Sequence, residues 1–135
     1  FSYSYKQQQI NPKKVYSIDT GLSTANSISF SKDIGKMLEN SVFLHLRRRY
    51  RDIFYFREKN ECDFLVKEKE KVIMAMQVCW ELDEENRERE LNGLKEAMDE
   101  FRLPEGFIIT CNQDDRFEIG GKKITVLPAW KWASH

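Results

Sequence analysis

The stretch ECDFLVKEKEKVIMAMQVCW, residues 61–80, indicates the fold class of this chain. Two apolar runs, Cys62 to Lys67 and Val72 to Trp80, predict two strands. The polar segment KEKEK between them predicts a short turn at the tip of a hairpin. We therefore expect a β-hairpin at the centre of the chain, with the flanking segments packed around it.

Three side chains of this hairpin are candidates for chemistry. Asp63 is a carboxylate inside the first apolar run. Gln77 and Cys79 lie two residues apart on the second strand, so we expect their side chains on the same face of the sheet. These residues place an acid, an amide and a thiol on adjacent strands.

Helical patterns lie on both sides of the hairpin. Ser31 is a candidate N-cap for a helix that runs to about Arg49. A second helix is expected to begin at the N-cap Asp83 and to end at Pro104. Apolar residues recur at helical spacing in both segments: Ile34, Met37, Leu38, Val42 and Leu46 in the first, and Leu91, Leu94, Ala97, Met98 and Phe101 in the second.

Further strands complete the pattern. Ile53 to Arg57 precedes the hairpin, and Gly106 to Cys111 is a continuous apolar run that predicts a strand covered on both faces. Phe117 to Ile119 and Lys123 to Leu127 flank Gly120-Gly121, a pair that suits a two-residue turn. The order helix, three strands, helix, strand and terminal hairpin predicts an α/β fold, with a mixed central sheet flanked by helices.

Composition bounds the class of protein. The chain has 135 residues, which suits one domain over residues 15–135, with residues 1–14 as a linker or edge extension. It begins with Phe1, so we expect a fragment of a longer protein. Its formal net charge is zero, unlike a general nucleic-acid-binding composition. Three isolated cysteines and no membrane-length apolar run suggest a cytoplasmic protein without a membrane partner.

The acids and the amide suggest a weak metal site. Glu39 lies in the first helix near its apolar side, and it could reach Asp63 and Gln77. Mg²⁺ prefers oxygen ligands, which these three side chains offer. Metal-dependent hydrolysis also uses a cation to position the attacking water, and Cys79 supplies no charge there.

Other enzyme signatures are weaker. The triplet DTG at Asp19 to Gly21 matches aspartic proteases, but that chemistry needs two such carboxylates, and the triplet is more simply a turn. Cys79 or Cys111 could act as a nucleophile with His45 as base. Because both cysteines lie in predicted strand interiors, structural burial is the preferred interpretation.

Two surface features suggest binding. Arg47, Arg48, Arg49 and Arg51 form a basic cluster that either contacts phosphate or an acidic partner, or is a solvated helix face. The tail PAWKWASH contains two tryptophans, which we expect on an extended segment. They either stack on bases or a partner, or cover the core with one ring in and one ring out: Trp130 and Trp132.

In this order, the segments KKVYSIDTGL, GKMLENSVFLHLRRR, ECDFLV, MQVCWEL and LPAWKWA resemble a known family. The chain is similar to the C-terminal domain, named only as being of unknown function, of uncharacterised prokaryotic AAA-type ATPases. The resemblance covers nearly the whole chain. It implies a separate N-terminal ATPase domain with a P-loop, joined through a winged-helix-like region. This chain has no GxxxxGK[ST] motif, so ATP would bind only in that other domain.

The resemblance also implies a restriction-endonuclease-like core of the PD-(D/E)XK type. It matches Glu39 to the helix acid, Asp63 to the motif acid, Gln77 to the second acid and Cys79 to the lysine. Many members read E-V-K on the third strand, and another group reads Q-V-C, as here. The expected function is an accessory module that is degenerate as a nuclease and binds nucleic acid, such as DNA, or a protein partner.

Two alternatives stay open. The first is an active Mg²⁺-dependent nuclease, which a lysine reaching the Asp63 site from elsewhere would favour, such as Lys95 or Lys67. The second is a protein-interaction or oligomerisation module, which would be favoured if the acidic second helix neutralises the arginine cluster.

Overall fold

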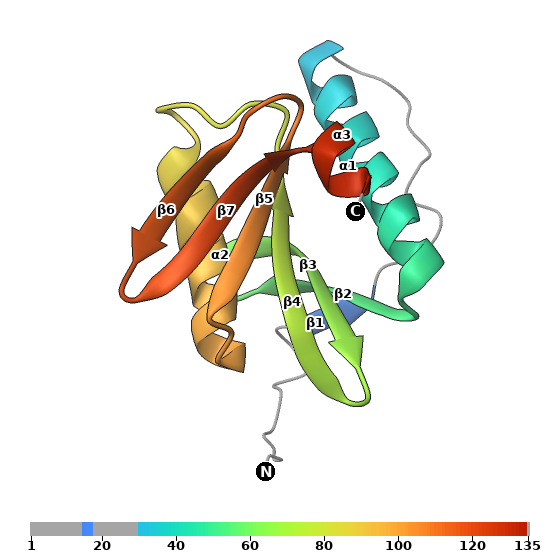
Figure 1. The fold of residues 1–135 in the computed structure, drawn as a ribbon, viewed down its shortest axis with the longest axis vertical. Coiled ribbons are helices and arrows are strands. Elements are labelled where there is room, and N and C mark those ends of the chain that lie inside the picture. The colour runs from blue at the N-terminus through green and yellow to red at the C-terminus, as the bar shows by residue number, and fades with distance from the viewer. Residues whose placement is uncertain (1–14, 18–29, 135) are drawn as a thin grey trace.

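The computed structural model of the chain describes residues 15–17 and 30–134 (Figure 1). The predicted linker 1–14 and the Asp19–Gly21 turn lie outside these residues. In chain order the elements are β1 (Val15–Ser17), α1 (Phe30–Arg49), β2 (Asp52–Arg57), β3 (Glu61–Glu68), β4 (Lys71–Val78), α2 (Arg87–Phe101), β5 (Glu105–Thr110), β6 (Asp115–Ile119), β7 (Lys122–Pro128) and α3 (Ala129–Ala133).

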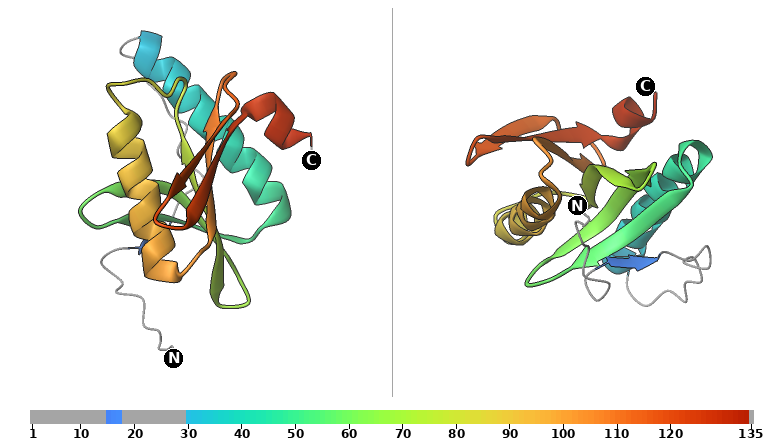
Figure 2. Two further views of the ribbon diagram at one scale, coloured as in Figure 1. Left: turned by 60° about the vertical axis from the view of Figure 1, so that its left-hand side comes forward. Right: turned by 90° about the horizontal axis from the view of Figure 1, so that it is seen from below.

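The strands form one mixed sheet of seven strands in the order β1-β2-β3-β4-β5-β7-β6. The strands β1 to β4 pair antiparallel, β5 pairs parallel with both β4 and β7, and β6 returns antiparallel along β7. The helix α2 is the crossover between the parallel strands β4 and β5. The predicted α/β fold with a mixed sheet flanked by helices is therefore confirmed (Figure 2).

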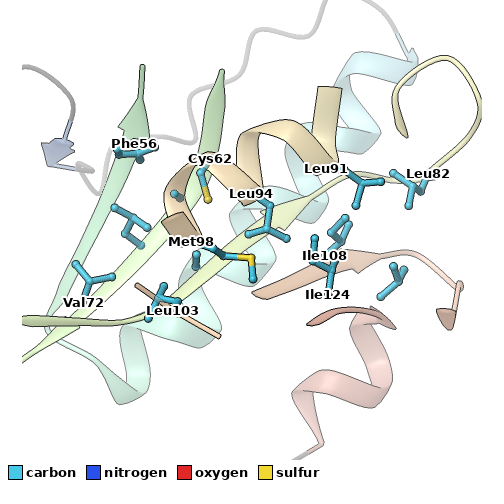
Figure 3. Packing of buried hydrophobic residues seen from close by; sticks show 14 residues of the cluster. Phe56, Cys62, Val72, Leu82, Leu91, Leu94, Met98, Leu103, Ile108 and Ile124 are labelled. Atoms are coloured by element: carbon cyan, nitrogen blue, oxygen red, sulfur yellow. The ribbon is translucent and has the colours of Figure 1, made fainter. Parts of the chain in front are cut away.

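Two buried clusters hold the layers together, one on each face of the sheet. The α2-side cluster packs Leu94 and Met98 of α2 against Ile108 and Ile124 of the sheet (Figure 3). The α1-side cluster packs the apolar stripe of α1 on the other face, where the rings of Phe43 and Phe64 stack with centroids 6.2 Å apart. The stripes predicted from helical spacing are thus largely the buried faces of the helices. On α1, Met37 is 69% exposed and Ile34 is only half-buried and outside both clusters.

An irregularity in β3 positions Asp63. Phe54 pairs with Leu65, and Phe56 pairs with Cys62. The chain therefore advances three residues along β3 where it advances only two along β2, so β3 carries one extra residue. This is a β-bulge, which breaks the alternation of side chains and redirects one of them. Cys62 and Leu65 both belong to the α2-side cluster, and Phe64 belongs to the α1-side cluster. The bulge therefore directs Asp63 and Phe64 together toward the α1 side.

Three sequence predictions of local structure were wrong. The helix α1 begins at Phe30, so Ser31 lies inside it and is not its N-cap. Asp83 accepts hydrogen bonds from the backbone N–H groups of Glu85 and Asn86, which stabilises the turn before α2, and α2 itself begins only at Arg87. The tail is the short helix α3 and not an extended segment.

The C-terminal end of α2 gives a first prediction. Arg102 adopts a left-handed conformation with φ 56°, and the next N–H, of Leu103, donates to the Met98 carbonyl at 2.9 Å. Glycine adopts this conformation without the steric cost of a Cβ. We expect Arg102→Gly to raise the free energy of unfolding by about 0.5–1 kcal/mol in urea denaturation. The matched change Asn92→Gly, inside α2, should lower it, and a loss of stability in both variants would contradict this account.

Candidate functional site

The candidate site lies where β3 and β4 separate. Their backbone pairing ends at Phe64 and Met76, although both strands continue. Two side chains replace the missing ladder hydrogen bonds. The Asp63 N–H donates to Gln77 Oε1 at 2.8 Å, and the Val78 N–H donates to Asp63 Oδ2 at 2.8 Å. Asp63 is thus fixed to β4 through both its backbone and its carboxylate.

Gln77 links three elements. Its Nε2 donates to the backbone carbonyl of Glu61 on β3 at 2.8 Å and to that of Glu90 on α2 at 3.0 Å. Together with the bond from Asp63, these contacts use both amide hydrogens and the amide oxygen. The side chain is also buried, with 2% of the residue exposed. Gln77 therefore acts as a structural connection between β3, β4 and α2.

The close approach of α2 to β3 depends on Gly93. A Cβ at this position would collide with the backbone carbonyl oxygen of Glu61 and would lie 2.7 Å from Gln77 Nε2. Since a carbonyl fixed in a strand cannot move aside as a side chain can, only glycine fits here. Gly93 and Gln77 together form one connection, which we call the Gln77–Gly93 contact.

Several carboxyl groups come together beside this contact. Burial, with the Glu39 charge as the next cause, raises the pKa of Asp63 to about 8. Burial also raises the pKa of Glu39 on α1, where the charge of Lys36 opposes the effect. Burial raises the pKa of Glu90 in the first turn of α2, opposed by Arg89, whose guanidinium lies 3.3 Å from the carboxylate. The charges of Glu39 and Glu90 thus both act on Asp63, and Glu90 is a carboxyl that the sequence analysis did not single out.

The pKa of Asp63 gives a second prediction. The pKa of Asp63 is higher in the folded state than in the unfolded state, so folding favours the protonated carboxyl group. The stability that this difference provides is fully present below pH 3.8 and is lost as the pH rises toward about 8. Asparagine cannot ionise and can still accept the Val78 N–H. We expect Asp63→Asn to be clearly more stable than the native chain at pH 9, with the difference disappearing near pH 4. Urea unfolding across this range tests it, and an equal difference at both ends would contradict it.

Cys79 lies on the same side of the sheet as Gln77, as predicted, because it packs against the α2-side cluster. Burial, followed by the charge of Glu90, raises the pKa of its thiol to about 12, so it is neutral near pH 7. Neither proposed replacement for a lysine reaches Asp63. Lys95 pairs with Asp99 at 3.1 Å, and the ammonium of Lys67 lies 5.3 Å from the centre of the Phe54 ring.

These residues do not fit a Mg²⁺ site. The oxygen of Gln77 already accepts a backbone hydrogen bond, and its amide hydrogens point toward two carbonyls. Within residues 15–17 and 30–134, no three His, Cys, Asp or Glu side chains are grouped as metal ligands. A ligand set of Glu39, Asp63 and Gln77 would place the cation beside the Asp63 N–H that Gln77 Oε1 already accepts.

The predicted binding residues lie on two helices, at the end of α1 and on α3. Arg47, Arg48 and Arg49 form the exposed last turn of α1, and Arg47 Nη1 donates to the Arg51 carbonyl at 2.8 Å. The helix α3 lies beside α1 (Figure 1). Its Trp132 ring meets the His45 ring edge-on with centroids 4.7 Å apart, so the imidazole packs against α3.

Trp130 on α3 is 65% exposed, and its Nε1 donates to Asn112 Oδ1 at 3.1 Å. One tryptophan ring is therefore turned inward and the other outward, as one of the two interpretations of the tail expected. We use the name basic surface for the exposed residues Arg47, Arg48 and Arg51 at the end of α1 together with Trp130 on α3.

Sequence reasoning missed Glu90 and Gly93. Glu90 is one of several acids in the segment 81–90, and Gly93 is an isolated glycine within a helical pattern. Their importance comes from the packing of α2 on β3, which local sequence does not specify. A glycine inside an otherwise strong helix was the available signal, since it costs helix stability and therefore suggests a packing reason.

The model of the family described as "Domain of unknown function (DUF4143)" matches residues 34–132, which run from the first part of α1 to the last part of α3. The chain is also 39% identical over 143 residues to "Uncharacterized protein MJ1544" of Methanocaldococcus jannaschii. This match covers 98% of the chain and 32% of the relative, so the chain spans about a third of its relative's length. None of the helices in the described residues has the length and apolar character needed to cross a membrane.

Proposed function

Because the chain belongs to the DUF4143 family, whose function is unknown, we propose its role from its own geometry. It is a nucleic-acid-binding accessory domain with a restriction-endonuclease-like core that has lost the capacity to cleave. The hydrogen bonding of Gln77 carries this proposal. At the position where the resembled nucleases have a metal-binding acid, the side chain uses all its hydrogen-bonding groups to connect β3, β4 and α2.

The thiol of Cys79 supports the same conclusion. A nuclease of this type needs a cation near the scissile phosphate, and a neutral thiol cannot balance the charge that develops there. Arg89 supplies the positive charge beside Glu90, but it is largely exposed and its guanidinium is paired with that carboxylate. Asp63 and Glu39 then remain as acids, and burial raises the pKa of both carboxyl groups.

Binding is assigned to the basic surface. Arginine side chains form charge-assisted hydrogen bonds to phosphate, and an exposed tryptophan can stack on an unpaired base. Arg47, Arg48 and Arg51 lie at the end of α1, where the helix dipole adds no positive field, so the affinity must come from the side chains themselves. Single-stranded DNA is the expected preferred ligand, because stacking needs an exposed base.

Fluorescence anisotropy with labelled single- and double-stranded DNA tests this proposal. We expect Arg47→Glu/Arg48→Glu to weaken binding by at least about tenfold at low salt and to reduce its salt dependence. The matched control is Lys59→Glu/Lys71→Glu, which makes the same change of charge at two exposed residues away from the basic surface. No binding by the native chain, or equal losses in both variants, would contradict the proposal.

One observation favours a protein partner as a second candidate. Met37 and Leu44 are 69% and 58% exposed and lie seven residues apart on α1, so they share a helix face. Exposed apolar side chains beside arginines are typical of protein interfaces. In the same anisotropy assay, Leu44→Ser should leave DNA binding unchanged if the ligand is nucleic acid.

We further propose that the domain is the C-terminal module of an AAA-type ATPase. The support is the resemblance of its segments and the length of its relative, of which two-thirds lies outside the match. The test is expression of the full-length protein and measurement of ATP hydrolysis with and without DNA. The proposal expects hydrolysis that a P-loop lysine substitution abolishes, and a full-length protein without ATP binding would contradict it.

A further inference from the structure

The strand β6 forms one edge of the sheet. It pairs with β7 on one side only, and within the described residues no strand lies on its other side (Figures 1 and 2). Ladder hydrogen bonds alternate along an antiparallel pair, so every second residue of β6 turns its N–H and C=O away from β7. This edge can accept another strand by hydrogen bonding of the backbone.

We propose that β6 pairs antiparallel with β6 of a second copy of this chain, in a two-fold arrangement centred on Phe117. The argument is the order of charges in DRFEI, residues 115–119. Arg116 and Glu118 are both exposed and lie two residues apart, so they project from the same face of the strand. Phe117 points to the opposite face, where it packs against the α2-side cluster.

In this register the charges complement one another. Arg116 lies opposite the partner's Glu118, and Glu118 lies opposite the partner's Arg116. At the ends of the strand, Asp115 lies opposite the partner's Ile119. Within the chain, Glu118 is also paired across β7 with Lys123. The face of the joined sheet therefore carries charges of alternating sign from Lys123 through Glu118 to the partner's Arg116, and each neighbouring pair is favourable.

Other registers are disfavoured. A parallel pairing in register, or an antiparallel pairing centred on Arg116 or Glu118, would place like charges opposite each other. Charged edge strands commonly prevent association when the charges have one sign. Here Arg116 and Glu118 carry opposite charges, so they disfavour the registers that place like charges opposite each other and favour the antiparallel register centred on Phe117. Within the described part of the chain, neither Arg116 nor Glu118 forms an ion pair, so both charges are available.

Because β6 has only five residues, the interface is small. We expect a weak dimer with a dissociation constant of about 10 μM to 1 mM. A two-fold contact of this kind uses the same surface of both copies and closes on itself, so association stops at the dimer. The basic surface lies on α1 and α3, away from β6 (Figure 1), so both copies can present it.

Sedimentation equilibrium of the chain over a range of concentrations tests the proposal. Arg116→Glu and Glu118→Arg each place two like-charge pairs in the interface, and each should weaken dimerisation by about tenfold or more. The double variant Arg116→Glu/Glu118→Arg exchanges the charges, restores complementarity and should dimerise within about threefold of the native chain. The pair Lys59→Glu and Glu70→Arg, at exposed residues of the β2–β3 and β3–β4 turns, serves as the matched control.

Three outcomes would overturn the proposal. The first is a native chain that stays monomeric up to about 1 mM. The second is a dimer that neither single reversal weakens, which would place the interface elsewhere. The third is a double variant that stays as weak as the single variants, which would exclude the register centred on Phe117. Circular dichroism of each exposed-charge variant confirms that it is folded.

Discussion

Gly93→Ala is expected to lower the free energy of unfolding by at least about 3 kcal/mol, although it adds only one methyl group. In a solvated helix this change would be stabilising, because alanine is the better helix former. Here the new Cβ would overlap the backbone carbonyl of Glu61 and press on Gln77 Nε2. The helix α2 would have to move away from β3, which would also weaken the packing of Leu94 and Met98.

The matched control is Gly35→Ala on α1, where a Cβ would have no neighbour within 4 Å. This variant should be more stable than the native chain by about 0.5–1 kcal/mol. Urea denaturation of both variants gives the comparison. A Gly93→Ala variant as stable as Gly35→Ala would mean that α2 does not approach β3 as closely as described, and the function assigned to Gln77 would lose its support.

Gln77→Leu is expected to lower the free energy of unfolding by about 2–4 kcal/mol. Leucine fills a similar volume but leaves the Asp63 N–H and the carbonyls of Glu61 and Glu90 without this partner. Each unpaired buried group carries a desolvation cost, and the separation of β3 from β4 gives them no nearby backbone replacement. Urea denaturation with an unchanged m-value is the expected result, because the unfolded state should be the same.

Gln77→Glu changes the hydrogen bonding at this position while it keeps the size and shape of the side chain. A carboxylate keeps the oxygen that accepts the Asp63 N–H, but it loses both donors and brings a charge close to Asp63. Its folded-state pKa should be raised, so the destabilisation should be smaller at pH 5 than at pH 8. A Gln77→Glu variant that is as stable as the native chain at pH 8 would contradict the account, since it would show that the position tolerates an acid.

Much of the fold could be predicted from the sequence, because its signals are local. The apolar stripes of the two helices and the Gly120-Gly121 turn correspond to α1, α2 and the β6–β7 hairpin. The strand period also placed Gln77 and Cys79 correctly on one face. It could not show which face, because both sides of the central strands are covered by helices and are equally apolar.

The geometry at Asp63 could not be predicted. The bulge in β3 arises from its pairing with β2, and the run ECDFLV shows no local sign of an extra residue. The position of Trp132 could not be predicted from the sequence either, because two tryptophans two residues apart are compatible with a strand and with a short helix. Its contact with His45 depends on the placement of α3 beside α1, which is a tertiary effect.

The proposed loss of cleavage depends on the absence of a competent divalent site among Glu39, Asp63 and Gln77. Calorimetric titration of the chain with Mg²⁺ and Mn²⁺, combined with a cleavage assay on single- and double-stranded DNA, tests it most directly. Asp63→Asn is the control, because it keeps the packing and removes the carboxylate. We predict no saturable metal binding tighter than about 1 mM and no cleavage. Saturable binding that Asp63→Asn abolishes, together with metal-dependent cleavage, would contradict this account and identify the chain as an active nuclease.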